Sequence, residues 1–233
     1  MFRNLRADEI DARIAQIKPK GVTLLLYKDA RCDMNILDET FGAFGWERKH
    51  EVIDGRLYCT VKIKDPDSGE WISKQDVGTE SYTEKEKGQA SDSFKRACFN
   101  WGIGRELYTA PFIWVNADKV NIENGKTYDK FSVDKIEYYK NKIVILVIRN
   151  ITKGCIAFTW ESPAYVNELV STLLKEMERT GITEDKVTAM FKVNGIGNMN
   201  VEMLQKALKK MAKTPDKEKN ENSNTDTADN KKE

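Results

Sequence analysis

The feature that most constrains this fold is an amphipathic pattern in residues 78–108, which read GTESYTEKEKGQASDSFKRACFNWGIGRELY. The apolar residues recur at steps of three and four, which is typical of a helix with one buried face. At about 100° of turn per residue, they fall within an arc of roughly 80°. These residues are Ala90, Phe94, Ala97, Cys98 and Trp101. Gly102 and Gly104 follow, and they are expected to end the helix.

The opposite side of the same predicted helix carries an adjacent pair of cations, Lys95 and Arg96. They project away from the buried stripe, and Gly88 on that side lets another molecule approach closely. The pattern therefore predicts a helix that supports a basic floor for a nucleic-acid backbone.

Three strand-like segments precede this helix. Residues 46–53 lead into the turn Asp54-Gly55, which is a strong signal for a two-residue hairpin. Residues 56–64 alternate between apolar and polar side chains, so one face of the strand is buried and the other is wet. The turn DPDSGE then leads to a third strand, 71–78. We predict an α+β fold with a β-β-β-α core, an antiparallel sheet packed on a long helix.

The rest of the chain is predicted in less detail. Residues 5–17 look like a short helix, 21–27 a strand, 34–41 a helix and 109–116 a strand or a loop. Further strands follow 127, with a hairpin at 140–142. Three helices after Ser162-Pro163 form a small all-helical module, and the polar tail should be disordered. The predicted domains are residues 1–161, the helical module 162–211 and the tail 212–233.

The sequence carries few signals of catalysis. It has no GxxxxGK[ST] motif for a nucleotide, no CxxC pair and a single histidine, His50. Asp65 and Asp67 form a DxD, but they lie in a hairpin turn, where a turn role is expected. We predict no enzyme activity, no cofactor and no metal. No apolar run of about 18 residues and no leader-like segment occurs, which predicts a soluble cytoplasmic protein that is not in a membrane.

Nucleic-acid binding has more support, although the net charge is only +1 and any such site needs local segregation of charge. Basic residues interleave with aromatic ones in three places. Cations neutralise phosphates, and aromatic rings stack on the bases of a single strand. A solvated surface of mixed charge would look similar, and Tyr58 could equally be a packing residue of its sheet. The three clusters are Tyr27/Lys28/Arg31, Arg56/Tyr58/Lys62 and Lys95/Arg96/Arg105/Tyr108.

The pattern D-S-F-K-R-A…W-G-I-G-R-x-L-Y, with FGAFGW and VG before it, resembles the Rad52-like single-strand annealing proteins. It is most similar to their bacteriophage, Sak-type members, over about residues 5–110. The resemblance implies an ATP-independent protein that anneals complementary single strands of DNA in homologous recombination. It also implies a homo-oligomer, a ring or an open helical filament, whose β-β-β-α core lines a positively charged groove with the DNA bases facing outward.

The resemblance extends to individual residues. Lys95 and Arg96 match the pair that grips the DNA backbone, and Arg56 resembles a lysine of a second, outer DNA site. Phe99 stands where eukaryotic relatives have a basic residue, so the inner site would either be weaker or rely on Arg105. The predicted DNA-binding residues are Arg13, Tyr27, Arg31, Arg56, Lys62, Lys87, Lys95, Arg96 and Arg105.

The predicted partners are single-stranded DNA, the annealing duplex intermediate and further copies of the chain. From family resemblance alone, residues 163–211 would recruit the host single-strand-binding protein, while GIG at 195–197 could instead belong to a DNA-binding helix-hairpin-helix. Two rival functions stay open. One is a replication accessory protein that binds single strands without annealing them, and the other is a metal-dependent nuclease.

Overall fold

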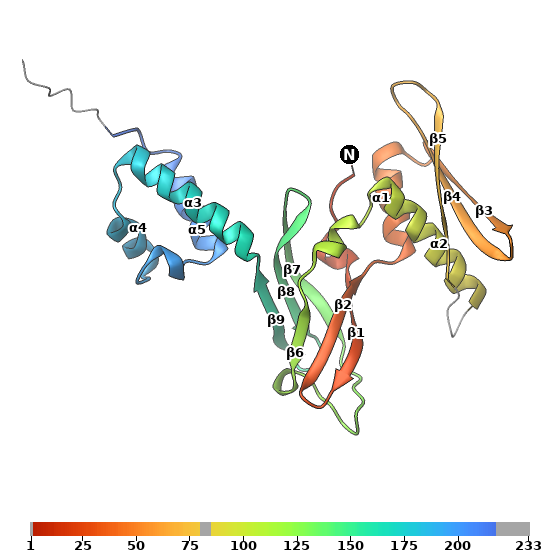
Figure 1. Ribbon diagram of the computed structural model, residues 1–233, viewed down its shortest axis with the longest axis horizontal. Coiled ribbons are helices and arrows are strands. Elements are labelled where there is room, and N and C mark those ends of the chain that lie inside the picture. Colours follow the sequence, from red (N-terminus) through yellow and green to blue (C-terminus); the bar gives the residue numbers. More distant parts are fainter. Residues whose placement is uncertain (1, 80–84, 218–233) are drawn as a thin grey trace, which may run out of the picture. The chain divides into compact units, whose positions relative to one another are not determined.

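The computed structural model describes residues 2–79 and 85–217 of the chain. Contacts between Cα atoms divide it into two compact units, Met1–Ser162 and Pro163–Glu233, which we call the N-terminal and C-terminal units. Two antiparallel sheets and helices form the N-terminal unit, so the predicted α+β class is confirmed (Figure 1). None of the helices within the described ranges is both long enough and apolar enough to cross a membrane.

The larger sheet has six strands in the order β6-β2-β1-β7-β8-β9. Every pairing within it is antiparallel. The β7–β8 hairpin turns at Lys140 and Asn141, with φ of 50° and 58°, close to the predicted position. The six strands are β1 (Asp11–Lys18), β2 (Gly21–Tyr27), β6 (Ile113–Asn116), β7 (Phe131–Tyr139), β8 (Lys142–Asn150) and β9 (Cys155–Glu161).

The predicted helix at residues 5–17 is wrong. A single 3-10 turn, Ala7–Glu9, precedes β1, which forms a hairpin with β2. The register shifts between Ile14 and Gln16, so Ile14 lies opposite Leu24 and Ile17 opposite Val22. This bulge puts two isoleucines three positions apart on one face of a strand, and that spacing imitates a helix.

The smaller sheet has the predicted three strands, β3 (Trp46–Ile53), β4 (Arg56–Lys64) and β5 (Trp71–Val77). Alternate residues of β4 are buried, among them Cys59, Val61 and Ile63. They face α2 (Lys85–Trp101), which packs across β4 and β5 (Figure 1). Phe94, Ala97 and Cys98 of α2 are fully buried, as the periodicity predicts. The β-β-β-α core is thus confirmed.

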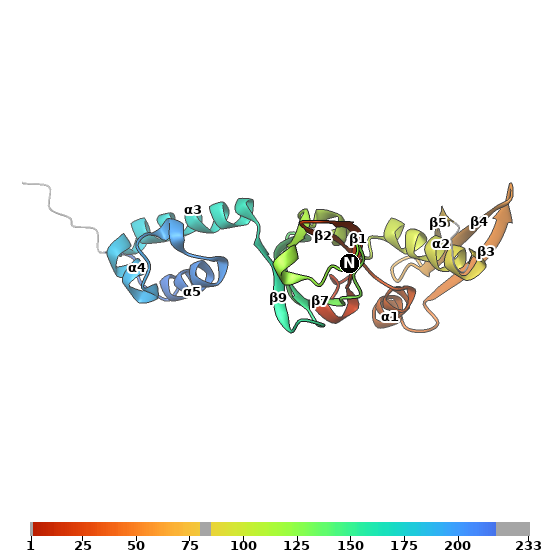
Figure 2. The ribbon, with the colours of Figure 1, turned by 90° about the horizontal axis from the view of Figure 1, so that it is seen from below.

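The helix predicted from about Met34 begins four residues earlier, as α1 (Ala30–Phe41). Asp29 is its N-cap, because its side chain accepts hydrogen bonds from the N–H groups of Arg31 and Cys32. The helix packs against α2 and the edge of β3 (Figure 2).

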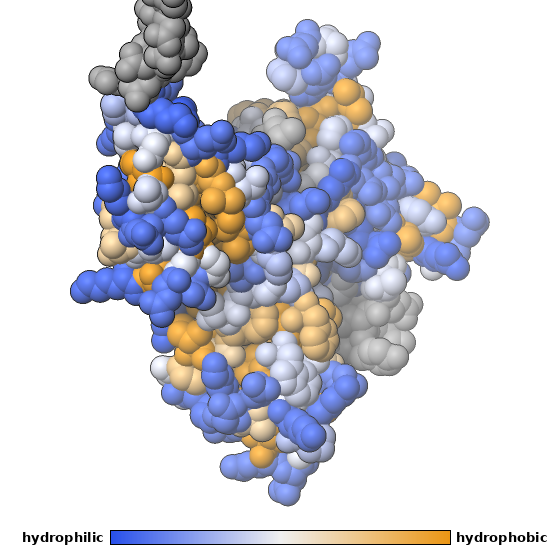
Figure 3. Space-filling view, turned by 60° about the vertical axis from the view of Figure 1, so that its left-hand side comes forward, coloured by the Kyte–Doolittle hydropathy of each residue, from blue (hydrophilic) through white to orange (hydrophobic). Residues whose placement is uncertain are grey.

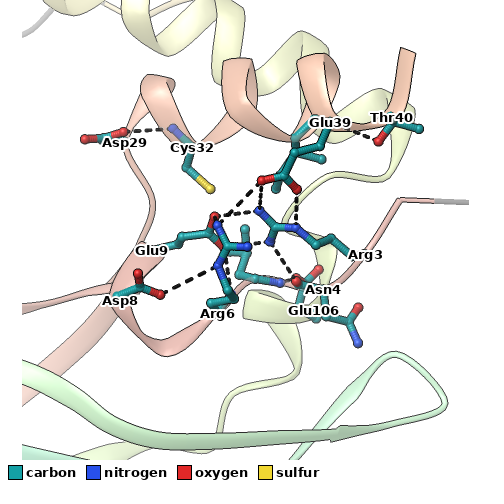
Figure 4. Close-up of polar contacts among 12 residues, drawn as sticks. Arg3, Asn4, Arg6, Asp8, Glu9, Asp29, Cys32, Glu39, Thr40 and Glu106 are labelled. Atoms are coloured by element: carbon teal, nitrogen blue, oxygen red, sulfur yellow. Dashed lines mark hydrogen bonds and ion pairs between the residues drawn. The ribbon is translucent and has the colours of Figure 1, made fainter. Parts of the chain in front are cut away.

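Polar contacts fix the segment before β1 to the rest of the N-terminal unit. Arg3 pairs with both Glu9 and Glu39, at 2.7 and 2.6 Å, and so joins this segment to α1 (Figure 4). The carboxylate of Glu106 is buried and accepts a hydrogen bond from the Leu5 N–H at 2.7 Å. The start of the chain thus contacts both α1 and the segment after α2.

The C-terminal unit contains α3 (Pro163–Thr180), α4 (Glu184–Phe191) and α5 (Val201–Met211). Leu173 and Leu204 are fully buried, and α3 packs on α5. Residues up to 217 hold contacts with α3, since the Lys217 N–H donates to the carbonyl of Arg179. The remainder of the predicted disordered tail, residues 218–233, lies outside the described residues.

Candidate nucleic-acid interface

A groove of about 640 Å³ lies in the N-terminal unit between β2 and α2. Polar and apolar side chains both line it. Tyr27 and Lys28 come from β2 and the residue after it, Lys95, Arg96 and Phe99 come from α2, and Tyr108 comes from the turn beyond α2. The groove therefore joins segments that lie about seventy residues apart in the sequence.

The α2 wall of the groove carries the predicted pair of cations. Arg96 is half-exposed, and its Nε lies 3.4 Å from a carboxylate oxygen of Asp76 on β5. Lys95 is less exposed, and it makes no ion pair or hydrogen bond with any residue that the structure describes. Phe94, on the packed stripe of α2, is fully buried and stacks on Trp46 with ring centroids 6.0 Å apart. Both cations therefore line the groove together with Asp76 and Asp92, and Lys95 also interacts electrostatically with the buried Asp33.

The β2 wall presents Tyr27, whose side chain is 41% exposed. Arg13 lies on the same face of the β1–β2 hairpin and places its guanidinium 5.5 Å from the centre of the Tyr27 ring. It also forms an ion pair with Asp11 at 2.5 Å. Of the predicted residues, Tyr27, Lys95 and Arg96 therefore line this groove, and Arg13 lies against Tyr27.

A buried ion pair supports the floor of the groove, and sequence reasoning missed it. Lys28 donates a hydrogen bond to Asp33 of α1, and both side chains are buried. Burial raises the pKa of Asp33 from its ordinary 3.8 to about 6, although the neighbouring cations Lys28 and Lys95 oppose this shift. The available signal was the alternation of β2, which continues through Val22, Leu24 and Leu26 and places Lys28 on the buried face.

Arg105 lies at the end of the groove and contacts the C-terminus of α2. Its Nε and Nη2 donate hydrogen bonds to the carbonyls of Phe99 and Asn100, each at 2.7 Å. Its guanidinium lies 5.5 Å from the centre of the Phe99 ring. Since the last carbonyls of a helix have no partner within the helix, Arg105 satisfies two of these acceptors.

The other predicted residues do not line the groove. Arg31 lies in the first turn of α1 and pairs with Asp29 at 2.8 Å in a hollow that Asp8, Glu9 and Asp11 also line. Lys62 lies on the face of β4 that points away from α2 and pairs with Glu47 at 2.8 Å.

Two further predicted residues occupy other positions. Arg56 follows the hairpin turn at the tip of β3 and β4 and is exposed. Lys87 is exposed in the first turn of α2. The structure therefore separates the nine predicted residues into a set at the groove and a set outside it.

The described residues contain no group of three or more His, Cys, Asp and Glu side chains arranged as they would be around a metal ion. The predicted turn role of Asp65 agrees with its contacts, because its carboxylate accepts hydrogen bonds from the Asp67 N–H and the Ser68 hydroxyl. All four cysteines are free thiols, and burial raises the pKa of Cys98.

Two comparisons with known proteins bear on this groove. A family model described as Rad52/22 family double-strand break repair protein matches residues 3–127, a range that includes both walls of the groove. The chain is also 34% identical over 97 residues to the single-stranded DNA-binding protein DdrA of Deinococcus radiodurans. That match covers 41% of this chain and 45% of the relative, so the chain spans less than half the length of the relative.

Proposed function

The chain belongs to the Rad52/22 family of double-strand break repair proteins, and from this premise we propose that it binds single-stranded DNA in the groove between β2 and α2 and anneals complementary strands. The observation that carries this proposal is the placement of Lys95 and Arg96 side by side on one wall, opposite Tyr27. Phosphates require cations, and single strands also offer bases to aromatic rings. The relative DdrA, whose name describes single-stranded DNA binding, supports the choice of ligand.

The mechanism requires no nucleotide. Lys95 and Arg96 hold the phosphate backbone of one strand by charge, which leaves bases available for pairing with a second strand. Once a duplex forms, its stiffer backbone fits the groove less well, and the product is released. The energy for the exchange comes from base pairing, so the reaction proceeds without ATP.

We also propose the assembly and the setting in which this occurs. Several copies form a ring or a helical filament, so that neighbouring grooves bind one continuous strand. The segment Gly102-Ile103-Gly104-Arg105 follows the pattern of bacteriophage members, which favours a role in phage recombination within the host cytoplasm.

The C-terminal unit would serve as a docking module for a partner such as the host single-strand-binding protein. Its helices leave Leu174 and Met190 about half-exposed. The face drawn in Figure 3 is largely hydrophilic, and hydrophobic residues form separate patches on it. Exposed apolar patches of this kind are typical of sites that contact other proteins. Deletion of residues 163–233 should leave DNA binding intact and reduce partner recruitment, which a pull-down with that protein would measure.

Annealing of complementary oligonucleotides without ATP tests the main proposal. We expect the protein to accelerate pairing and its affinity for single strands to fall steeply with salt, by about 0.7 in log K per log salt for each phosphate contact. The name of DdrA also fits the rival role of a protein that binds strands without annealing them. Tight binding without faster pairing would support that rival. Cleavage that depends on Mg²⁺ or Mn²⁺ would instead indicate a nuclease, and binding that is insensitive to salt would refute the basic groove.

A further inference from the structure

The end of the groove beside the C-terminus of α2 is aromatic. Phe99 lines the groove, and its ring lies 4.9 Å from that of Tyr108, centroid to centroid, with the planes tilted by 58°. Tyr108 is 83% exposed, an unusual state for a large ring that borders an apolar hollow. Leu107, Ala110 and Pro111 continue the apolar lining on this side. This end of the groove is therefore aromatic and aliphatic, with the exposed Tyr108 ring at its edge, whereas Lys95 and Arg96 make another part of the groove positively charged.

The backbone that carries these rings is anchored. Arg105 fixes the end of α2 through its two hydrogen bonds to carbonyls and covers the Phe99 ring. The 3-10 turn Arg105–Thr109 begins after Gly104 in the left-handed conformation, with φ of 79°. On one side Glu106 accepts the Leu5 N–H, and on the other Thr109 Oγ1 accepts the Ile143 N–H at 2.9 Å. Tyr108 is therefore an exposed ring on a segment whose position is fixed, so contact with a ligand would cost little ordering of the backbone.

We propose that Tyr108, backed by the Phe99 ring, forms a stacking platform for one nucleobase of the bound single strand, which is a refinement that rests on the proposed function. Phe99 follows Lys95 by four residues and Arg96 by three, so all three side chains are neighbours on the surface of α2, with about 5–6 Å between Cβ atoms. A nucleotide whose phosphate is held by the two cations has its base within reach of the rings. Every base has a π-face, so the platform accepts any sequence.

This placement also explains Phe99, which stands where the resemblance predicts a cation. Arg105 does not simply replace that charge, because two of its N–H groups bind backbone carbonyls. Relative to the family pattern, the groove therefore has one phosphate contact fewer and one base contact more at this position. Whereas the resemblance predicts bases that all face outward, one base for each chain would here turn toward the groove wall.

The experiment compares two ligands of equal length, a single-stranded oligonucleotide and an abasic deoxyribose-phosphate oligomer, binding to the full chain by fluorescence anisotropy. Since stacking contributes about 1–3 kcal/mol per base, the wild-type protein should bind the base-bearing strand about 5- to 150-fold more tightly. Tyr108→Ala should reduce this ratio toward one and leave the salt dependence unchanged, because no phosphate contact is lost. Tyr108→Phe, which keeps the ring, should behave like the wild type.

The outcomes separate the two ideas. If wild-type protein binds both ligands equally, or if Tyr108→Ala weakens both by the same factor, the platform is refuted while single-strand binding stands. If wild-type protein binds neither ligand, the proposed function and the platform are both refuted.

Discussion

Two surfaces of the N-terminal unit carry cations and differ in what lies beside those cations. In the groove, Lys95 has no ion-pair partner among the described residues, and Arg96 has one at 3.4 Å. On the face of the three-stranded sheet that points away from α2, Lys62 pairs with Glu47 at 2.8 Å and Lys49 with Glu51 at 3.3 Å. Among the described residues Lys95 therefore forms no direct ion pair, whereas Lys62 and Lys49 on the outer face are each paired with a glutamate.

A cluster of basic residues in a sequence does not by itself form an anion-binding site. The register of the strands determines whether Lys62 is free to bind an anion. Lys62 lies directly opposite Glu47 in the β3–β4 ladder, and oppositely charged cross-strand neighbours attract. The groove cations instead lie on the side of α2 away from its buried stripe, in the same groove as Tyr27 of β2.

The largest effect should come from removing the groove cations. Lys95→Ala combined with Arg96→Ala should weaken single-strand binding about 100-fold or more, because hydrogen bonds to charged groups contribute about 1.5–3 kcal/mol each. Annealing should be abolished, and the salt slope should fall by about 1.4. Fluorescence anisotropy across a salt series and an annealing assay measure these quantities.

A matched control is available on α5. Lys209→Ala with Lys210→Ala removes the same charge from another adjacent pair, in the C-terminal unit, and should leave binding and its salt slope unchanged. If both double variants lose affinity equally, net charge rather than the groove determines binding. The groove would then bind DNA no better than other basic surfaces of the protein.

The next largest effect is on the free energy of unfolding, and it should come from replacing Lys28, the buried cation beneath the groove. Lys28→Met keeps the aliphatic stem but leaves the Asp33 carboxylate buried without its partner, which should lower the free energy of unfolding by about 3–5 kcal/mol. Lys28→Met with Asp33→Leu removes both charges and should recover most of this loss. Urea denaturation followed by tryptophan fluorescence is suited to the measurement, because Trp46, Trp71, Trp101, Trp114 and Trp160 all lie in the N-terminal unit. Equal stability of Lys28→Met and wild type would refute a supporting role for the pair.

The pH dependence of this buried pair has a defined sign. The pKa of Asp33 is raised to about 6 from an ordinary 3.8, so its contribution to stability is complete below 3.8 and is lost as the pH rises through 6. Relative to Asp33→Asn, the wild-type free energy of unfolding should fall by about 2 kcal/mol between pH 4 and 7. Surface carboxylates behave oppositely, since Arg149 lowers the pKa of Asp134 and its contribution is lost as the pH falls. If the free energy of unfolding of the wild type, relative to that of Asp33→Asn, rises with pH, the raised pKa of Asp33 is contradicted.

Local patterns predicted the part of the fold that forms this groove wall. The helical period of α2 gives both its buried stripe and the outward direction of Lys95 and Arg96, and the Asp54-Gly55 turn gives the β3–β4 hairpin. The same reasoning failed at residues 5–17 because a bulge in β1 produces a helical spacing in a strand. The spacing of apolar residues alone cannot distinguish a helix from a bulged strand, because the bulge depends on the strand with which β1 pairs.

The opposite wall and the floor could not be predicted, because they depend on contacts distant in sequence. β1 joins β7 through Asp11 and Ala12, which lie opposite Ser132 and Phe131 more than a hundred residues away. The burial of Lys28 depends on Asp33 from α1 and on the backbone at Gly104, where an added Cβ would lie 2.4 Å from the Lys28 Cε. No local pattern contains such information.

The smallest effect on single-strand affinity should come from cations outside the groove. Arg56→Ala with Lys62→Ala removes an exposed side chain at the hairpin tip and one already paired with Glu47. Exposed ion pairs contribute about 0–1 kcal/mol, so we expect the Kd for the first strand to change less than about 5-fold. If Arg56 belongs to an outer DNA site, the annealing rate should decrease more than this affinity does, because the second strand would bind there. A loss of first-strand affinity as large as that of the Lys95/Arg96 variant would show that cations outside the groove bind DNA as well as those inside it, and the groove would no longer be the primary site.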